Sequence, residues 1–170
     1  MPKKKATVDD DGSTALSEFR NHPVANLLGI RILSVTRKRV TAEMHITPAH
    51  INRAGRVNGG IIMTFADILG ARGTVANLPK GARTATIESK TNFFAAGAGP
   101  KLIGVSIPLH VGRTTNVWQT TVSNTNGKRV AIVTQTQIVM TRPGTDPGPA
   151  LTRAEQQRAW TPSAPTRRSP

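Results

Sequence analysis

Residues 59–78 form the mostly apolar segment GGIIMTFADILGARGTVANL. It predicts a single helix of about five turns. Asn58, directly before it, is a favourable residue for capping the helix start. Apolar side chains fall on nearly every side of this helix, so most of its surface must be buried.

Strand patterns lie on both sides of this helix, and most of them follow it. Apolar and polar residues alternate with the two-residue period of half-buried strands. Pro108 interrupts one alternating run, which predicts a sheet edge or a bulge there. A strong turn signal, Asn124-Thr-Asn-Gly127, joins the last two strands into a hairpin. The predicted strands cover residues 40–47, 84–94, 103–111, 117–122 and 130–140.

One long buried helix combined with five or six strands predicts an α+β fold, with an antiparallel sheet wrapped around the helix. A weaker helix is predicted over 16–28, interrupted by Pro23 and ended by Gly29. The chain of 170 residues has the length of one domain, which we assign to residues 15–141.

Both ends of the chain differ in composition from this domain. The polar residues 1–14 predict a disordered N-terminal arm. Residues 142–170 form a tail rich in proline and arginine, in which 152–160 could form a short helix.

The composition excludes several classes of chemistry. With no cysteine, the chain has no disulfide, thiolate metal site or cysteine nucleophile, and this fits a reducing compartment, here the cytoplasm. Four scattered histidines argue against a metal site. No targeting segment is visible, and the longest apolar region is too polar to span a membrane.

The chain is strongly basic, with a net charge of +14, and most of that charge falls within the predicted domain. A basic body favours anionic partners such as nucleic acid, acidic lipid or a phosphorylated small molecule. Aromatic residues are only 4% of the chain and no nucleic-acid recognition motif is present. We therefore expect neither a specific nucleic-acid partner nor a membrane partner.

The helix start is the first candidate for chemistry. The first amides of a helix have no partner inside it, and Gly59 and Gly60 have no side chains to shield theirs. A ligand carbonyl oxygen could approach and accept these N–H groups at the positive end of the helix dipole. The alternative is an ordinary capped helix start whose glycines serve close packing.

Asp67 is the second candidate. It is the only carboxylate between Glu43 and Glu88, and it lies in the most apolar helix. A carboxylate in such surroundings needs a partner or a function. The alternative is a structural salt bridge to Arg72 or Arg53.

Helical spacing places Asp67 on a narrow stripe of small or polar residues, with an apolar stripe beside it that can face the sheet. The small stripe consists of Gly60, Thr64, Asp67, Ala71 and Thr74, and the apolar stripe of Ile61, Phe65, Ile68 and Val75.

Gly59 and Asp67 are too far apart to serve one site within a single chain. Eight residues of helix separate them by about 12 Å along the axis. A reacting carbon needs its oxyanion donors and its base within roughly 3 Å. Two antiparallel helices from two chains would bring the amide of one to Asp67 of the other, which gives two equal sites in a two-fold dimer.

These motifs together resemble the hotdog-fold acyl-coenzyme A (CoA) thioesterases of the phenylacetate-pathway type, over about residues 20–140. The matching motifs are Asn52-Arg-x-Gly55-x-Val57-Asn58-Gly59-Gly60, Phe65-Ala66-Asp67, Thr86-Ile-Glu88-x-Lys90-x-Asn92-Phe93, Val111-Gly112-Arg113 and Gly127-Lys-x-Val130-Ala131. The resemblance implies a hotdog fold, active sites at a dimer interface, and often a tetramer built from two dimers.

The resemblance also implies roles for single residues. Asp67 matches the acid that acts as general base or nucleophile, and Gly59 the glycine whose amide polarises the thioester carbonyl. Asn52 matches the residue that orients the acyl group or the attacking water, and Thr86 falls where some members place a hydroxyl. Asn58 stands where the family usually has histidine. Asparagine can donate a hydrogen bond but cannot titrate near neutral pH.

Further residues are candidates for holding the substrate. His50 precedes the loop and could line the site, although a structural role is the stronger expectation. Lys90 and Arg113, together with Lys101 and Arg129, could bind the phosphates of CoA, and Arg113 lies in a context that matches the family. The alternative is ordinary solvated surface charge.

The leading hypothesis is hydrolysis of an acyl- or aryl-CoA thioester with no metal or redox cofactor. A second hypothesis is a non-catalytic protein that binds acyl-CoA, in which Asn58 marks lost chemistry. Nucleic-acid binding and a hotdog hydratase are weaker alternatives, and the histidine–carboxylate motif of such hydratases is not found.

Overall fold

The computed structural model describes residues 22–141, 152 and 154. The predicted arm at 1–14 lies outside the described residues, as does nearly all of the tail and its helix at 152–160. The elements in chain order are α2 (Pro23–Leu27), β1 (Ile30–Thr36), β2 (Arg39–His45), the 3₁₀ turn η1 (Pro48–His50), α3 (Gly59–Val75), β3 (Arg83–Phe93), β4 (Lys101–Val111), β5 (Thr115–Asn124) and β6 (Arg129–Met140).

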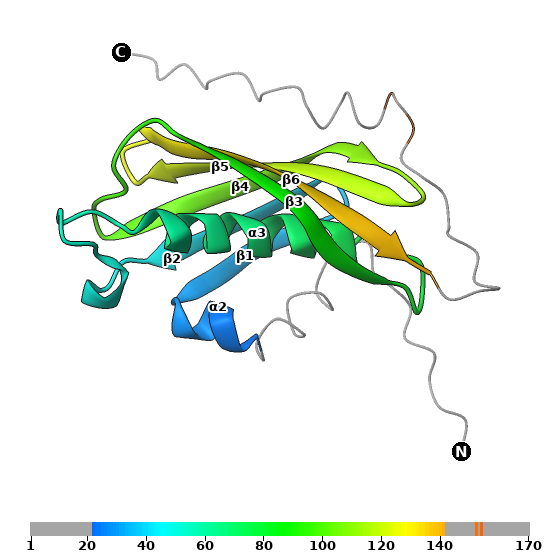
Figure 1. The fold of residues 1–170 in the computed structure, drawn as a ribbon, viewed down its shortest axis with the longest axis horizontal. Helices are drawn as coiled ribbons and strands as arrows, with labels where there is room; N and C mark the ends of the chain where they lie inside the picture. The colour runs from blue at the N-terminus through cyan, green and yellow to red at the C-terminus, as the bar shows by residue number, and fades with distance from the viewer. Residues whose placement is uncertain (1–21, 142–151, 153, 155–170) are drawn as a thin grey trace, which may run out of the picture.

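The six strands form one antiparallel sheet in the order β1-β2-β4-β5-β6-β3. Helix α3 lies along one face of this sheet and contacts every strand (Figure 1). The predicted α+β arrangement of one long helix against an antiparallel sheet is therefore confirmed. Strands β1 and β3 are the two edges of the sheet, and β3 lies beside α3.

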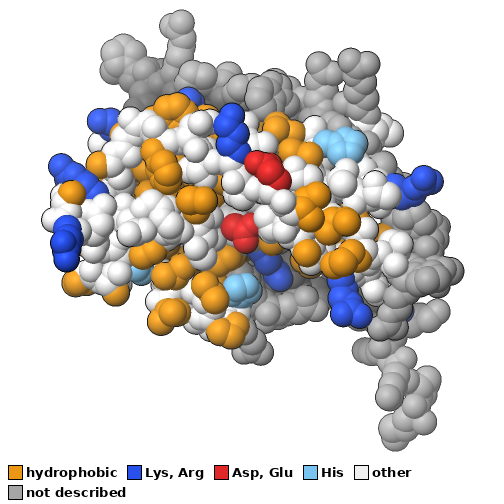
Figure 2. Space-filling model, viewed as in Figure 1, with side chains coloured by type: hydrophobic (Ala, Val, Ile, Leu, Met, Phe, Trp, Pro, Cys, Tyr) orange, Lys and Arg blue, Asp and Glu red, His pale blue; other side chains and the backbone are white. Residues whose placement is uncertain are grey.

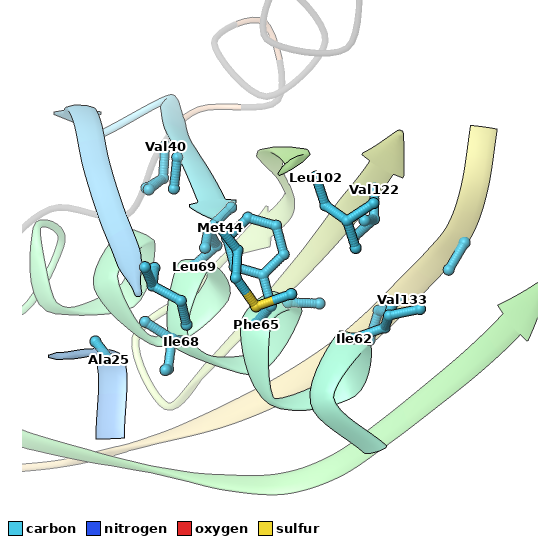
Figure 3. Packing of buried hydrophobic residues seen from close by; sticks show 14 of the residues in the cluster. Ala25, Val40, Met44, Ile62, Phe65, Ile68, Leu69, Leu102, Val122 and Val133 are labelled. Carbon is cyan, nitrogen blue, oxygen red and sulfur yellow. The ribbon is translucent and has the colours of Figure 1, made fainter. Parts of the chain in front are cut away.

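The hydrophobic core fills the space between α3 and the sheet. Phe65 and Leu69 of α3 are fully buried and pack with residues such as Met44 and Leu102 (Figure 3). Gly104 in β4 permits this approach, because a Cβ there would lie 2.7 Å from Leu69 and 2.8 Å from Phe65. Burying a side chain of this size contributes about 1.5–3 kcal/mol, so these contacts hold α3 firmly on the sheet.

The buried face of α3 differs from the predicted stripes near the helix end. The helix ends at Val75, and Val75 is 38% exposed while Thr74 is fully buried. The prediction that Val75 faces the sheet is therefore wrong, as is the place of Thr74 in the small stripe. Gly73 is on the buried face. At 3.6 residues per turn, Val75 is rotated about 200° around the helix axis from Gly73 and so lies nearly opposite the buried face. Thr74 is rotated only about 100° from Gly73.

The five predicted strands are present, and β1 is a sixth that the alternation did not indicate. A bulge between Ile32 and Ser34 places Leu33 and Ser34 both on exposed positions, which breaks the two-residue period. Pro108 lies beside a bulge and beyond the last residue of β4 that pairs with β2, Ser106. Of the two predicted alternatives for Pro108 the bulge is confirmed, whereas β4 is an inner strand of the sheet and not an edge.

Of the helix predicted over 16–28, residues 16–21 lie outside the described residues, and the described helix α2 begins at Pro23, a favourable position for proline in the first turn. The Nδ1 atom of His22 accepts a hydrogen bond from the Ala25 amide at 3.1 Å and caps the helix. Gly29 follows the helix with a φ of +60°, as expected for the residue that ends it. Within the described chain no helix is long and apolar enough to cross a membrane.

Candidate active site

The start of α3 leaves a single amide available. The side-chain oxygen of Asn58 accepts the Gly60 N–H at 2.8 Å, and its backbone oxygen accepts the amides of Ile61 and Ile62. Asn58 is therefore the predicted N-cap, and the Gly60 amide is already used inside the chain. Of the first four helix amides, that of Gly59 alone has no acceptor among the described residues. This N–H is the one that a ligand oxygen can accept at the positive end of the helix.

An aromatic ring stands beside that amide. A Cβ on Gly59 would lie 3.1 Å from Cζ of Phe93, the last residue of β3. Phe93 is 50% exposed, so its ring forms an apolar wall that solvent or a ligand can reach. We did not predict Phe93 as a site residue, because only the packing of β3 beside α3 brings it to the helix start.

The loop before α3 is a small closed unit built around Asn52. The Oδ1 atom of Asn52 accepts the amides of Ala54 at 2.9 Å and Arg56 at 3.2 Å, and the Asn52 amide donates to the Arg56 carbonyl. Gly55 has a φ of +71°, which suits glycine at this tight turn. The oxygen of Asn52 therefore holds the loop. Its Nδ2 group donates to none of the residues in the described segment and stays available to a ligand.

His50 is buried beside this loop and holds it in place through hydrogen bonds. It is 2% exposed, and its Nδ1 accepts the Thr47 amide at 3.2 Å. Its carbonyl accepts the Asn58 amide at 2.8 Å, which ties the loop to the helix start. These contacts agree with the structural alternative for His50 rather than with a side chain that lines the site.

Asp67 lies half-buried in the middle of α3 and is held by neutral groups. Its Oδ1 accepts the Thr86 hydroxyl at 2.9 Å and Nε2 of Gln135 at 3.1 Å. Among the described residues Asp67 forms no ion pair, so the alternative of a salt bridge to Arg53 or Arg72 is not what the structure shows. Its second oxygen, Oδ2, accepts no hydrogen bond from the part of the chain described here.

Thr86, which the resemblance implied only as a hydroxyl at this position, donates to Asp67 in the structure, and Gln135 is a further donor. Residues 133, 135 and 137 of β6 are all buried on the side of the sheet that faces α3. A glutamine at such an inward position was the signal in the sequence, because buried polar side chains need partners.

The candidate phosphate-binding residues are spread over the surface. Lys90 and Arg113 are exposed, but Lys101 donates to Oε2 of Glu43 at 2.5 Å and is therefore occupied. Arg113 lies in the turn between β4 and β5. The next residue, Thr114, accepts a hydrogen bond from the Val139 amide, and Val139 pairs with the first residues of β3. Arg113 is therefore near the end of the sheet where β3 begins. Gly59 lies where β3 ends. One subunit therefore does not bring Arg113 to the helix start.

Glu43 is a buried carboxylate that the sequence analysis did not assign. It is 3% exposed and alternates with core residues Ala42 and Met44, so it lies on the sheet face away from α3. Hydrogen bonds from Lys101, and then from Arg31, lower the pKa of Glu43 to about 2. This cluster is an ion-pair network that joins β1, β2 and β4.

The sequence is similar to proteins named as putative esterases and to one named as a CoA thioester hydrolase. Residues 54–131 match the family model of the thioesterase superfamily. A putative esterase of Archaeoglobus fulgidus is 30% identical over 115 residues, which cover 67% of this chain and 73% of that protein. A putative esterase of Deinococcus radiodurans is 34% identical over 91 residues, 53% of this chain, and the match spans only 60% of that relative's length. A 1,4-dihydroxy-2-naphthoyl-CoA hydrolase of Listeria monocytogenes is 20% identical over 62% of this chain and 85% of its own.

The fold matches a solved structure over most of both chains. A thioesterase family protein from Silicibacter pomeroyi superposes with a TM-score of 0.72 at 24% identity, covering 77% of this chain and 98% of that one. This similarity confirms the predicted hotdog fold. The family match and the Archaeoglobus relative show that the chain belongs to the thioesterase superfamily.

Proposed function

We propose that this protein hydrolyses acyl- or aryl-CoA thioesters to the free acid and CoA. The observation that carries the proposal is the pair of groups left open on α3. These are the Gly59 amide, which has no acceptor among the described residues, and the carboxylate of Asp67, whose Oδ2 accepts no hydrogen bond from those same residues.

The chemistry follows from these two groups. The Gly59 N–H binds the thioester carbonyl oxygen and stabilises the oxyanion that forms on attack, an effect worth about 3 kcal/mol per donor. Asp67 takes a proton from water as the water oxygen bonds to the carbonyl carbon. When the C–S bond breaks, the thiolate of CoA takes that proton and the acid is released. In the alternative route an oxygen of Asp67 attacks the carbonyl carbon, the C–S bond breaks to release CoA as its thiolate, and water then hydrolyses the mixed anhydride to the free acid and Asp67.

The site requires two subunits under this proposal. Within one α3 the two groups are about 12 Å apart along the axis, so Gly59 of one copy would work with Asp67 of a second. The free edge of β3 supports such an assembly, because it exposes unpaired backbone groups together with apolar side chains. Ile87 is 59% exposed and Phe93 50%. Figure 2 shows apolar side chains spread over this view of the molecule, with acidic side chains near its middle. A tetramer of two such dimers is an extension of the same assembly.

CoA is the favoured leaving group because the protein is strongly basic and CoA carries several phosphates. Lys90 and Arg113 are exposed and available to them. The Listeria relative named as a CoA thioester hydrolase supports this choice. The cysteine-free composition supports work in a reducing compartment such as the cytoplasm.

The test is thiol release from a panel of acyl- and aryl-CoA esters, comparing the wild type with Asp67→Asn. We expect the variant to lose activity on every ester that the wild type cleaves. Glu88→Gln makes the same chemical change at an exposed carboxylate and should leave the rate unchanged. Equal rates for the wild type and Asp67→Asn would end the catalytic assignment.

A second candidate function, acyl-CoA binding without catalysis, is favoured by one observation. The side-chain oxygen of Asn58, at the position of the family's usual histidine, is engaged in capping Gly60. Saturable binding of acyl-CoA with no turnover, unchanged in Asn58→His, would support this function over hydrolysis.

A further inference from the structure

A buried polar network lies directly beneath Asp67, between α3 and the strands β6 and β3. Its first member, Gln135, is fully buried. The Nε2 group of Gln135 donates to Oδ1 of Asp67 at 3.1 Å and to the backbone oxygen of the same residue at 3.1 Å. One amide therefore holds both the side chain and the backbone of Asp67.

Core stability does not explain this glutamine. Its Oε1 atom is buried and has no donor among the described residues. A buried polar atom without a partner costs about 1–3 kcal/mol. An apolar residue such as the neighbouring inward-facing Val133 would avoid that cost. We therefore attribute the presence of Gln135 at this position to its hydrogen bonds with Asp67.

Gly70 leaves room for the side chain of Gln135 beside α3. It lies about one turn after Asp67, and a Cβ there would lie 2.5 Å from Cδ and 2.7 Å from both amide atoms of Gln135. A Cβ at position 70 would therefore displace the amide of Gln135 from its place. Glycine on the helix thus leaves the space in which the amide of Gln135 reaches Asp67.

Gln137 acts on the second donor to Asp67. It is 1% exposed, and its Nε2 donates to the Thr86 hydroxyl at 2.6 Å while its Oε1 accepts the Thr84 hydroxyl at 3.1 Å. A threonine hydroxyl has a single hydrogen. Because the oxygen of Thr86 already accepts from Gln137, its hydrogen is directed to Oδ1 of Asp67.

We propose that Gln135 and Gln137 are positioning residues that fix Asp67 with Oδ1 bound toward the sheet and Oδ2 presented as the reacting oxygen. All the donors are neutral, so they orient the carboxylate without cancelling its charge. A lysine or arginine in the same place would pair with Asp67 and weaken it as a base. This inference rests on the proposed function, since it assigns the reacting atom of the same site.

The experiment compares Gln135→Met and Gln137→Met in the full-length protein on an ester that the wild type cleaves. Both changes keep the side-chain volume and remove the donor. We expect kcat to fall about tenfold to a hundredfold, as for a misplaced catalytic group, with KM and the Kd of a non-hydrolysable thioether analogue nearly unchanged. The matched control is Gln119→Met on β5, where a half-buried glutamine bonds to Thr134 instead. It should keep the wild-type kcat.

A double-variant series separates positioning from structural damage. Gln137 acts through the Thr86 hydroxyl, so adding Gln137→Met to Thr86→Val should lower kcat no further. Gly70→Ala disturbs the same contact from the helix side and should lower kcat as Gln135→Met does. It serves as the second variant if Gln135→Met does not fold.

The outcomes distinguish this inference from the proposed function. Loss of activity in Asp67→Asn with wild-type kcat in both methionine variants would overturn the positioning role and leave the function intact. Independent, multiplicative losses in Thr86→Val and Gln137→Met would also overturn it. Full activity in Asp67→Asn would remove the proposed function and this inference together.

Discussion

The ring of Phe93 packs against the first residue of α3, so that a Cβ on Gly59 would come within 3.1 Å of Cζ of the ring. The end of β3 and the start of α3 thus form one compact unit, with an open amide on one side and an apolar wall on the other. This explains why residue 59 has no side chain. A methyl group there would displace either the ring or the helix start.

Gly59→Ala should therefore lower kcat with little loss of stability. The half-exposed ring can yield, which limits the loss of stability, whereas any shift of the helix start moves the amide away from the thioester carbonyl, so we expect kcat to fall about tenfold to a hundredfold. Steady-state kinetics and thermal unfolding measure the two effects. A Gly59→Ala protein with the wild-type kcat would show that this amide is not the oxyanion donor.

Asn58→Ala should reduce the stability of the protein, because it removes the acceptor of the Gly60 amide. Loss of such a cap costs about 1 kcal/mol of unfolding free energy, which urea denaturation can measure. Asn58→Asp keeps an oxygen in place and adds a negative charge at the positive helix end, so it should retain the wild-type stability. If the alanine variant is as stable as the aspartate variant, the side-chain cap contributes nothing.

Acid should destabilise the fold through Glu43. Its pKa is lowered from 4.5 to about 2, first by the hydrogen bond from Lys101 and then by that from Arg31. The folded state thus holds the charged form more tightly than the unfolded state does. The stability from this group is fully present above pH about 4.5 and is lost as the pH falls toward about 2.

Urea unfolding at several pH values between 2 and 6 tests this prediction. Glu43→Gln should show a weaker pH dependence than the wild type in the window given by the pKa shift, whereas Glu88→Gln, at an exposed carboxylate, should follow the wild type. Parallel curves for the wild type and Glu43→Gln would contradict the role of the ion-pair network.

Periodicity in the sequence identified most of the fold but not its irregular points. It indicated five strands and the long helix, because each keeps one period over many residues. It missed β1, where the bulge after Ile32 puts two consecutive residues on exposed positions. It also misplaced Val75, because this residue lies on the side of α3 away from the buried Gly73.

The candidate site was only partly accessible from the sequence. Local signals identified the Asn58 cap, and the resemblance indicated a hydroxyl at Thr86 but not its hydrogen bond to Asp67. Gln135 lies 68 positions from Asp67 in the chain, and only the order of strands in the sheet brings them together. Phe93 reaches Gly59 for the same reason. Contacts of this kind depend on the three-dimensional packing and have no local signature.

Mixed dimers provide the sharpest test of a site shared between subunits. If Gly59 of one copy works with Asp67 of the other, a heterodimer of Gly59→Ala and Asp67→Asn chains contains one intact site and one site with both defects. Two different tags and tandem purification after co-expression isolate this heterodimer.

We expect about half of the wild-type rate per dimer, although each variant alone is impaired. A dimer of two Asp67→Asn chains, purified in the same way, is the matched control and should stay inactive. A heterodimer no more active than the two parent variants would mean that each subunit works alone. Because Gly59 and Asp67 lie far apart on one α3, the two groups could then not act on the same substrate molecule.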